Sequence, residues 1–179
     1  MDQLLASDVE QDDPEAVPKT LGFPVLPVQK LPPHDAAYFA GIVDGEGSIT
    51  VQVGGGQLTA YVLVSNSSAA LMDWLYESAG GYVRAAISGR SAVIKGTKPM
   101  YRWQIGGANA ITLLEQVAPH LVIKGRQAHA ALAAISAWHT RDLAGALAHT
   151  QVVRRLNNFR ARKYWKAKRE EAPPSHTTG

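Results

Sequence analysis

Two carboxylates close together in the sequence, Asp44 and Glu46, are the residues of this chain best suited to do chemistry. They end a short apolar stretch, DAAYFAGIVDGEGS over residues 35–48, which has the composition of a buried helix. A second carboxylate pair brought near them would be repelled unless a cation lay between the pairs. Carboxylate oxygens are also ligands that Mg²⁺ and Ca²⁺ prefer. The pair therefore indicates a candidate divalent-metal site.

The helix that should carry these acids has one face of small residues. Ala37, Gly41 and Gly45 recur at i, i+4 and i+8, which places them on one side of a helix. Each glycine inside a helix costs about 1 kcal/mol relative to alanine. A close approach of a second helix would explain why two glycines are placed there. This face is therefore predicted to meet another helix at backbone distance.

Residues 39–47, FAGIVDGEG, resemble the nine-residue signature of the LAGLIDADG homing endonucleases. Ala40, Gly41, Asp44 and Gly47 are identical to the signature letters, and the acid at Glu46 replaces another acid. Ile42 and Val43 are conservative exchanges, and Phe39 and Gly45 differ from the signature in size. Weaker matches extend the resemblance over residues 35–163, namely the turn at 80–83, the Pro-x-Leu-x-x-Lys segment at 119–124 and the Leu-Asn pair at 156–157.

The resemblance implies a site-specific double-stranded DNA endonuclease that hydrolyses phosphodiester bonds with Mg²⁺, for which Mn²⁺ can substitute. It implies metal ligands at Glu46, Gly45 and Asp44, and catalytic roles for Glu46, Lys124 and Asn66. Lys124 lies where similar enzymes carry a basic residue near the scissile phosphate. Asn66 is equally suited to cap the helix that follows it, since Asn-Ser-Ser precedes an apolar segment. For Glu46 the alternative is a helix-terminal acid that only turns the chain.

A single copy of the signature predicts a homodimer, because a site with two acids then requires two chains. The DNA site of such a dimer should be long and roughly palindromic. A free-standing or intron-encoded homing enzyme fits this description, since no splicing domain flanks the signature. The expected dimer interface consists of Ala37, Ala40, Gly41, Asp44 and Gly45.

The pattern of the chain predicts an α+β fold with an antiparallel four-stranded sheet, helices on one face and a polar DNA-binding face opposite. Strands are expected at 48–53, 58–65, 82–87 and 100–105, and helices at 69–78, at 108–117 and as one long segment from 127 to about 147. The order is αββαββα, as in the homing endonucleases that the chain resembles. The expected DNA contacts are Ser48, Thr50, Gln52, Thr59, Tyr61, Arg84, Arg90, Lys98, Arg102, Gln104, Arg160, Arg162 and Lys163.

Charge divides the chain into an acidic leader and a basic body. Residues 1–33 carry six acids, two lysines and six prolines, and because the whole chain has a charge of +3, the remainder carries +7. We expect a disordered leader at 1–33, with the alternative that Leu21, Phe23, Val25, Leu26 and Val28 lie as an extended strap on the body. An endonuclease-like domain is expected at 34–153, and a basic helix and tail at 154–179. Residues 154–169 hold eight basic residues, three aromatics and no acid, which favours phosphate binding over a merely solvated helix end.

Composition narrows the classes of protein further. The chain has no cysteine, which excludes disulfides and thiolate zinc sites. Neither a signal-like start nor an apolar run near twenty residues occurs, so an intracellular, cytoplasmic protein without a membrane partner is expected, and an organellar location remains compatible. A catalytically inactive relative, an RNA-splicing maturase or a transcription regulator, is the alternative to an enzyme. A protein-interaction module would leave the basic body unexplained.

Overall fold

A four-stranded antiparallel sheet forms the centre of the molecule. The computed structural model describes residues 17–85 and 99–170, with side chains described as far as residue 158. The sheet order is β1-β2-β4-β3, so that β1 and β3 are its edges. Its strands are β1 (Gly47–Gly54), β2 (Gln57–Asn66), β3 (Tyr82–Ala85) and β4 (Tyr101–Gly106).

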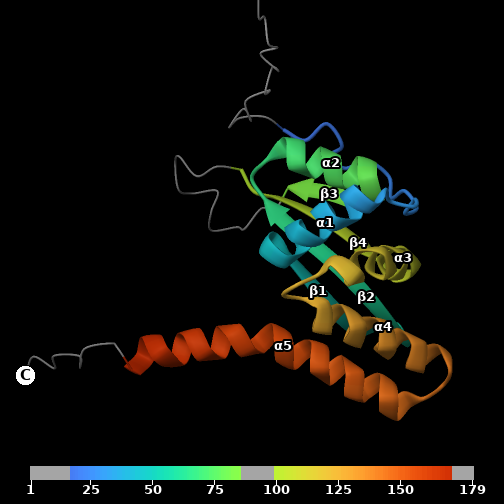
Figure 1. Ribbon diagram of the computed structural model, residues 1–179, viewed down its shortest axis with the longest axis vertical. Helices are drawn as coiled ribbons and strands as arrows, with labels where there is room; N and C mark the ends of the chain where they lie inside the picture. The colour runs from blue at the N-terminus through green and yellow to red at the C-terminus, as the bar shows by residue number, and fades with distance from the viewer. Residues whose placement is uncertain (1–16, 86–98, 171–179) are drawn as a thin grey trace, which may run out of the picture.

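Helices pack over one face of this sheet (Figure 1). They are α1 (Pro33–Glu46), α2 (Ala69–Ala79), α3 (Gly107–Val117), the 3₁₀ turn η2 (Ala118–His120) and α4 (Gly125–His139). The last helix, α5 (Leu143–Glu170), packs along α4 and then runs on away from the body (Figure 1). The α+β fold with the order αββαββα is confirmed.

Side chains of each strand alternate between the helix-covered face and the opposite face. Ile49 in β1, Val62 and Val64 in β2, and Trp103 in β4 are fully buried beneath the helices. Their neighbours along the strands are half-buried or exposed on the other side. Val53 is the exception, with 62% of its surface exposed near the hairpin turn. The alternation leaves one apolar face for the core and one polar face open.

Helix α1 is held against the sheet by its apolar side. Phe39 is fully buried and its ring lies 5.3 Å from that of Trp103, centroid to centroid, in an edge-to-face arrangement. Ala40 and Val43 are also fully buried. Burying one such phenylalanine stabilises the fold by about 2 to 3 kcal/mol. These contacts fix the direction in which the carboxyl end of α1, with its two acids, points.

The single helix expected over residues 127–147 is instead two helices. Helix α4 ends at His139, and Arg141 then takes a left-handed conformation with φ of 65°. The hydroxyl of Thr140 donates to the carbonyls of Ser136 and Ala137, which closes α4. Asp142 accepts a hydrogen bond from the Gly145 N–H at 2.9 Å and so caps the start of α5. The reversal folds α5 back along α4.

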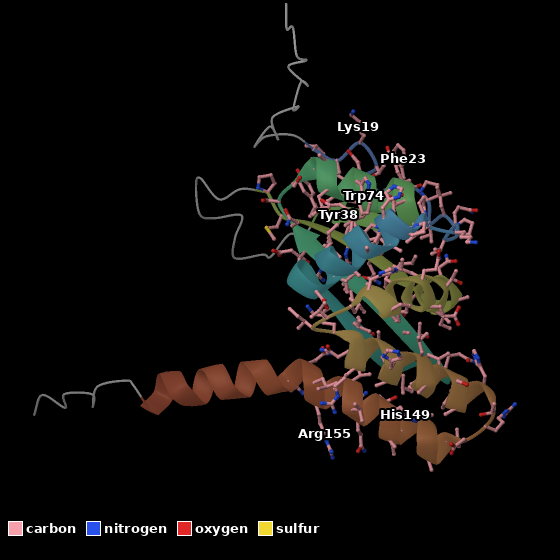
Figure 2. All side chains as sticks on the ribbon, viewed as in Figure 1. Lys19, Phe23, Tyr38, Trp74, His149 and Arg155 are labelled. Atoms are coloured by element: carbon pink, nitrogen blue, oxygen red, sulfur yellow. The ribbon has the colours of Figure 1, made fainter. Side chains whose placement is uncertain are left out.

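The leader, expected to be disordered, is ordered over residues 17–32, and this segment is called the strap below. Both oxygens of Asp73 in α2 accept hydrogen bonds from the strap, from the Lys19 N–H and from the N–H and hydroxyl of Thr20. The Tyr76 hydroxyl donates to the carbonyl of Pro24 at 2.9 Å. Lys19 and Phe23 lie beside α2 in Figure 2. The rest of the leader, residues 1–16, lies outside the described residues.

The strap also covers the β3 edge of the sheet. The Gly22 N–H donates to the Val83 carbonyl at 2.8 Å, and Leu21 forms an isolated bridge with Val83. An edge strand left open is a site for unwanted strand pairing, and the strap occupies it. Separately, no helix within residues 17–85 and 99–170 combines the length and the apolar character needed to cross a bilayer.

Candidate functional site

Helix α1 passes into β1 without a linker, and this junction positions the candidate site. The N–H of Gly47 donates to the carbonyl of Val43, closing the last turn of the helix. A Cβ atom added at Gly47 would lie 2.7 Å from the Val43 Cα and 2.8 Å from its carbonyl oxygen. Only glycine therefore fits between the helix and the strand. As a result, Glu46 and Ser48 are held at fixed positions beside the edge of the sheet.

Asp44 is an internal anchor of this junction. Its Oδ2 accepts hydrogen bonds from the N–H groups of Val122, at 2.7 Å, and Ile123, at 2.9 Å. Its Oδ1 accepts from the N–H of Lys124 at 2.8 Å, and the side chain is only 8% exposed. Burial raises the pKa of Asp44, but the three N–H donors and the charge of Lys124 outweigh it and lower the pKa below its ordinary value.

These bonds bear on two expectations about Asp44. Three of the four acceptor sites of its carboxylate are taken by N–H groups of the loop at residues 122–124, which leaves one site on Oδ1, and a metal-ligand role stays a prediction. Its burial also removes it from the expected dimer interface. A carboxylate at the end of α1 lies at the negative end of the helix dipole, and the backbone donors of the loop offset that repulsion.

Lys124 is joined to the same turn of α1. Its ammonium Nζ donates to the backbone carbonyl of Asp44 at 2.6 Å, and the side chain is only 9% exposed. The lysine thus makes contacts with both the main chain and the carboxylate of one residue. The predicted catalytic lysine is therefore brought to the carboxyl end of α1. Its partner there, Asp44, directly precedes Gly45 and lies two residues before Glu46.

A cavity of about 400 Å³ opens beside this junction. The residues that line it include Gly45, Gly47, Ser48 and Lys124. Glu46 is exposed, and no described residue forms a hydrogen bond or an ion pair with its carboxylate. The two acids of the signature therefore have different environments, since one is a structural anchor and the other is open to solvent and to a ligand.

Two polar residues of the cavity wall have no catalytic signal in the sequence. Gln127 of α4 donates through Nε2 to the Oδ1 of Asn157 in α5 at 3.2 Å. Asn157 donates in turn through Nδ2 to the carbonyl of Ile49 in β1 at 2.9 Å. Only the Leu-Asn pair at 156–157, noted as a weak family match, pointed to this position.

The solvent-exposed side of α1 carries the small residues. Ala37, Gly41 and Gly45 are all exposed, and a Cβ added at either glycine would meet nothing within 4 Å. The packing of this chain therefore gives no reason for glycine at these two positions. Ala40, expected on this face, is instead fully buried in the core beside Phe39. Tyr38 borders the face at 57% exposure and points toward Trp74 of α2, with the ring centroids 4.8 Å apart (Figure 2).

The open face of the sheet carries the predicted polar residues in register. Arg84 of β3 and Arg102 of β4 are directly opposite each other, so that their side chains share this face. Tyr61 lies opposite Gly106, where an added Cβ would come within 2.5 Å of the tyrosine ring. The remaining predicted contacts with described side chains are also half-buried or exposed, namely Ser48, Thr50, Gln52, Thr59 and Gln104.

Several predicted contacts cannot be placed on this face. Arg90 and Lys98 lie outside the described residues. Arg160, Arg162 and Lys163 belong to α5, but their side chains are not among those described. Arg155, slightly earlier in α5, extends away from the body in Figure 2. The basic tail is thus part of a helix that leaves the domain.

The structure of this chain is similar to solved structures of other proteins. No protein-family model matches the chain, and no curated protein matches it significantly. The homing endonuclease I-CvuI, solved with its DNA target, aligns over 70% of this chain and 81% of its own with a TM-score of 0.53 and 21% identity. The chain has the fold of the LAGLIDADG homing endonucleases. The resemblance indicated by the signature is thereby confirmed.

Two further homing endonucleases share this fold. The archaeal intron-encoded enzyme I-Vdi141I, solved with DNA, aligns over 70% of this chain and 83% of its own, with a TM-score of 0.51 and 16% identity. The LAGLIDADG homing endonuclease I-GzeII, solved with its DNA target, aligns over 86% of this chain with a TM-score of 0.50 and 16% identity. The match covers 53% of I-GzeII, so this chain spans about half of that protein.

Within the homing endonuclease fold, Asn66 has a local structural role. Its Oδ1 accepts a hydrogen bond from the Ser68 N–H at 2.9 Å, which forms a turn just before α2. Ser68 itself caps α2 by accepting from the Leu71 N–H at 3.2 Å. The helix cap is therefore Ser68, and Asn66 forms the turn that precedes it. A catalytic role for this residue stays a prediction.

Proposed function

We propose that this chain is a divalent-metal-dependent, site-specific endonuclease of double-stranded DNA that acts as a homodimer. One observation carries the proposal. The exposed glycine face of α1 ends at the exposed Glu46, next to the cavity that contains Lys124 and to the open polar face of the sheet. The solved proteins that share this fold are homing endonucleases bound to DNA, and this supports the same class of substrate here.

The glycine face supports a second copy of the chain as the partner of α1. Gly41 and Gly45 together forgo about 2 kcal/mol of helix stability, and no contact within the described chain requires them. A two-fold axis beside these glycines would let two α1 helices pack at backbone distance. The same axis would bring the two Glu46 carboxylates together at the carboxyl ends of the helices.

The donor set fits Mg²⁺. No cluster of three or more potential metal-ligating side chains of the His, Cys, Asp or Glu type occurs among the described residues. Mg²⁺ usually takes one or two protein carboxylates and completes its shell with water and phosphate oxygens, which suits an exposed Glu46 from each copy. Such an ion would supply an activated water and compensate charge on the phosphate. Mn²⁺ has the same oxygen preference and should substitute.

Lys124 would stabilise the charge that develops on the reacting phosphate. Its ammonium group is held by the Asp44 carbonyl at the cavity wall, so its position is fixed before DNA binds. A preorganised cation in a partly buried site stabilises a transition state more than one in water does. Glu46 and Lys124 thus act on the same phosphate from two elements.

The register of the sheet supports DNA as the ligand of the open face. Arg84 and Arg102 are cross-strand partners, and like charges directly opposite each other destabilise a sheet. A phosphate backbone placed over this face would offset that repulsion. Ser48 and Gln104 lie in a neighbouring row of partners, joined through Leu63, and can reach base edges.

The test is cleavage of DNA that spans the uninterrupted insertion site of the gene, with Mg²⁺, with Mn²⁺ and with EDTA. We expect double-strand cuts at one position with either metal and none with EDTA. Light scattering of the complex on the same DNA should give two chains per site. Specific binding without cleavage under all conditions would instead support the inactive nucleic-acid-binding relative. A monomer on DNA would contradict the homodimer.

A further inference from the structure

Asn157 lies where α5 leaves the body. Before this point α5 packs against its neighbours through Ala146, Thr150 and Val153, which are all buried. Asn158 is already exposed, and the remainder of the helix extends away from the sheet (Figure 1). From Asn157 to Glu170 the helix rises about 20 Å. The packed half of α5 therefore ends at Asn157. A displacement of the projecting half would move Asn157.

The amide of Asn157 joins three elements at this point. It donates to the Ile49 carbonyl of β1 and accepts from Gln127 of α4. Because β1 is an edge strand, only one of its two sides is paired with another strand. An asparagine side chain can donate and accept at the same time, whereas a hydrophobic or a carboxylate side chain cannot make both bonds. The contact fixes α5 against the edge of the sheet.

The same residue lines the cavity of the candidate site. Leu156 and Asn157 line it together with Gly45 and Lys124. Ile49, which Asn157 holds, comes three residues after Glu46 in the same continuous junction. The position of α5 therefore affects the width of the cavity in which the phosphate would react.

The sequence beyond Asn157 is rich in positive charge. Residues 160–169 contain six basic residues and no acid, within a helix that continues to Glu170. Lysine and arginine on a projecting helix bind DNA phosphates without regard to sequence. A force applied there by bound DNA would be transmitted along the rigid helix to Asn157 and the cavity wall.

We propose that Asn157 is a positioning residue that couples phosphate binding by the projecting half of α5 to alignment of the scissile phosphate with Glu46 and Lys124. The inference rests on the proposed nuclease function. It makes α5 more than an affinity element, because DNA bound along the basic half sets the geometry of the cavity. Without Asn157 the two functions of the helix separate, and DNA still binds but is misaligned.

The first experiment compares Asn157→Leu with Gln151→Leu, an exposed amide on the same helix and therefore a matched control. We expect Asn157→Leu to slow single-turnover cleavage at saturating protein by about tenfold or more, since misplacement on the order of 1 Å reduces rates strongly. Target affinity in a gel shift should change by less than about threefold. Gln151→Leu should match the wild type in both. Equal rates for the two variants would overturn the proposal.

The second experiment removes residues 160–179 from both the wild type and the Asn157→Leu variant. In the wild-type background the deletion should weaken binding to all sequences and also lower the saturated cleavage rate. In the Asn157→Leu background it should weaken binding but lower the rate no further, because the coupling is already lost. Independent, multiplicative effects on the saturated rate would overturn the proposal. Asn157→Asp, which keeps size and the bond from Gln127, provides the same test if the leucine variant does not fold.

Hydrogen exchange separates this inference from the nuclease function. DNA should slow exchange of the α5 amides on both sides of Asn157 in the wild type, but only beyond it in Asn157→Leu. Equal protection in both proteins would overturn the coupling even if the wild type cuts DNA. A wild type that binds but does not cut would refute the nuclease, and the exchange pattern would still decide the coupling.

Discussion

The two sides of α1 have opposite environments although they share one short sequence. On the inner side, Phe39, Ala40 and Val43 are fully buried, and Asp44 is anchored by backbone donors. On the outer side, Gly41 and Gly45 are exposed in open space. One signature thus serves two roles. The inner side packs into the domain, and the outer side is where the proposed partner and ligand would bind.

The two acids show this division most clearly, since they are only two residues apart. Asp44 accepts three hydrogen bonds from a loop far away in sequence, whereas no described residue hydrogen-bonds the carboxylate of Glu46. Stability should therefore depend on the first acid and activity on the second. Substitutions at the two positions distinguish these roles.

Glu46→Gln should cause the largest change, a loss of at least about a thousandfold in cleavage rate with little change in stability. The amide has nearly the size of the carboxylate but lacks the charge that would hold Mg²⁺ against the phosphate. Nicking in Mg²⁺ beside gel-shift affinity measures both properties. Glu115→Gln, which changes an exposed acid on α3, is the matched control. Cleavage by Glu46→Gln at the wild-type rate would refute the metal assignment.

Asp44→Ala should lower the free energy of unfolding by about 3 kcal/mol, because three N–H groups of the loop at 122–124 lose their acceptor. Urea unfolding measures the change. Glu46→Ala is the control on the exposed acid and should stay within about 0.5 kcal/mol of the wild type. Similar losses for both substitutions would contradict the division of roles between the two acids.

Gly41→Leu should stabilise the isolated chain by about 0.5 to 1 kcal/mol while preventing dimer formation. The new side chain enters open space in the chain but would hold two α1 helices apart. Thermal unfolding of dilute protein and sedimentation give the two measurements. Gly47→Ala should do the reverse and destabilise the fold, since its Cβ would lie 2.7 Å from the Val43 Cα. A Gly41→Leu variant that remains a dimer on DNA would disprove the proposed interface.

The smallest expected effect is a change in how the free energy of unfolding depends on pH below about pH 4, and it involves Asp44. The pKa of Asp44 is lowered because its backbone hydrogen bonds outweigh burial, which by itself raises it. The charged form is thus favoured by folding, and its contribution is fully present above the unfolded pKa of about 4. It is lost as pH falls through the lower, folded value. Asp44→Asn should therefore flatten the fall in the free energy of unfolding below about pH 4.

Local patterns in the sequence were sufficient for much of the fold. Alternation along β2 and β4 correctly predicted which side chains face the core, because side-chain direction in a strand has a period of two. The signature and the order of the elements predicted the homing endonuclease fold. The small-residue spacing of Ala37, Gly41 and Gly45 correctly predicted one shared face, since helical periodicity is also local.

Other features depend on contacts between distant residues. Asp44 is anchored because a loop 78 to 80 residues later places three N–H groups around its carboxylate, and no local pattern predicted that contact. The bond from Asn157 to Ile49 spans 108 residues, and the strap is ordered by Asp73, more than fifty residues away. Composition alone made residues 17–32 look disordered, because their four prolines say nothing about an acceptor on another element.

The sequence by itself therefore determined the types of the groups and the faces on which they lie. It provided two acids at the end of an apolar helix, a glycine face and a polar sheet face. Only the tertiary structure decided that Asp44 is anchored and Glu46 is open, and that Asn157 joins α5 to the cavity wall. The physical reason is that a carboxylate or an amide takes its role from the donors and acceptors around it, and folding brings those from distant parts of the chain.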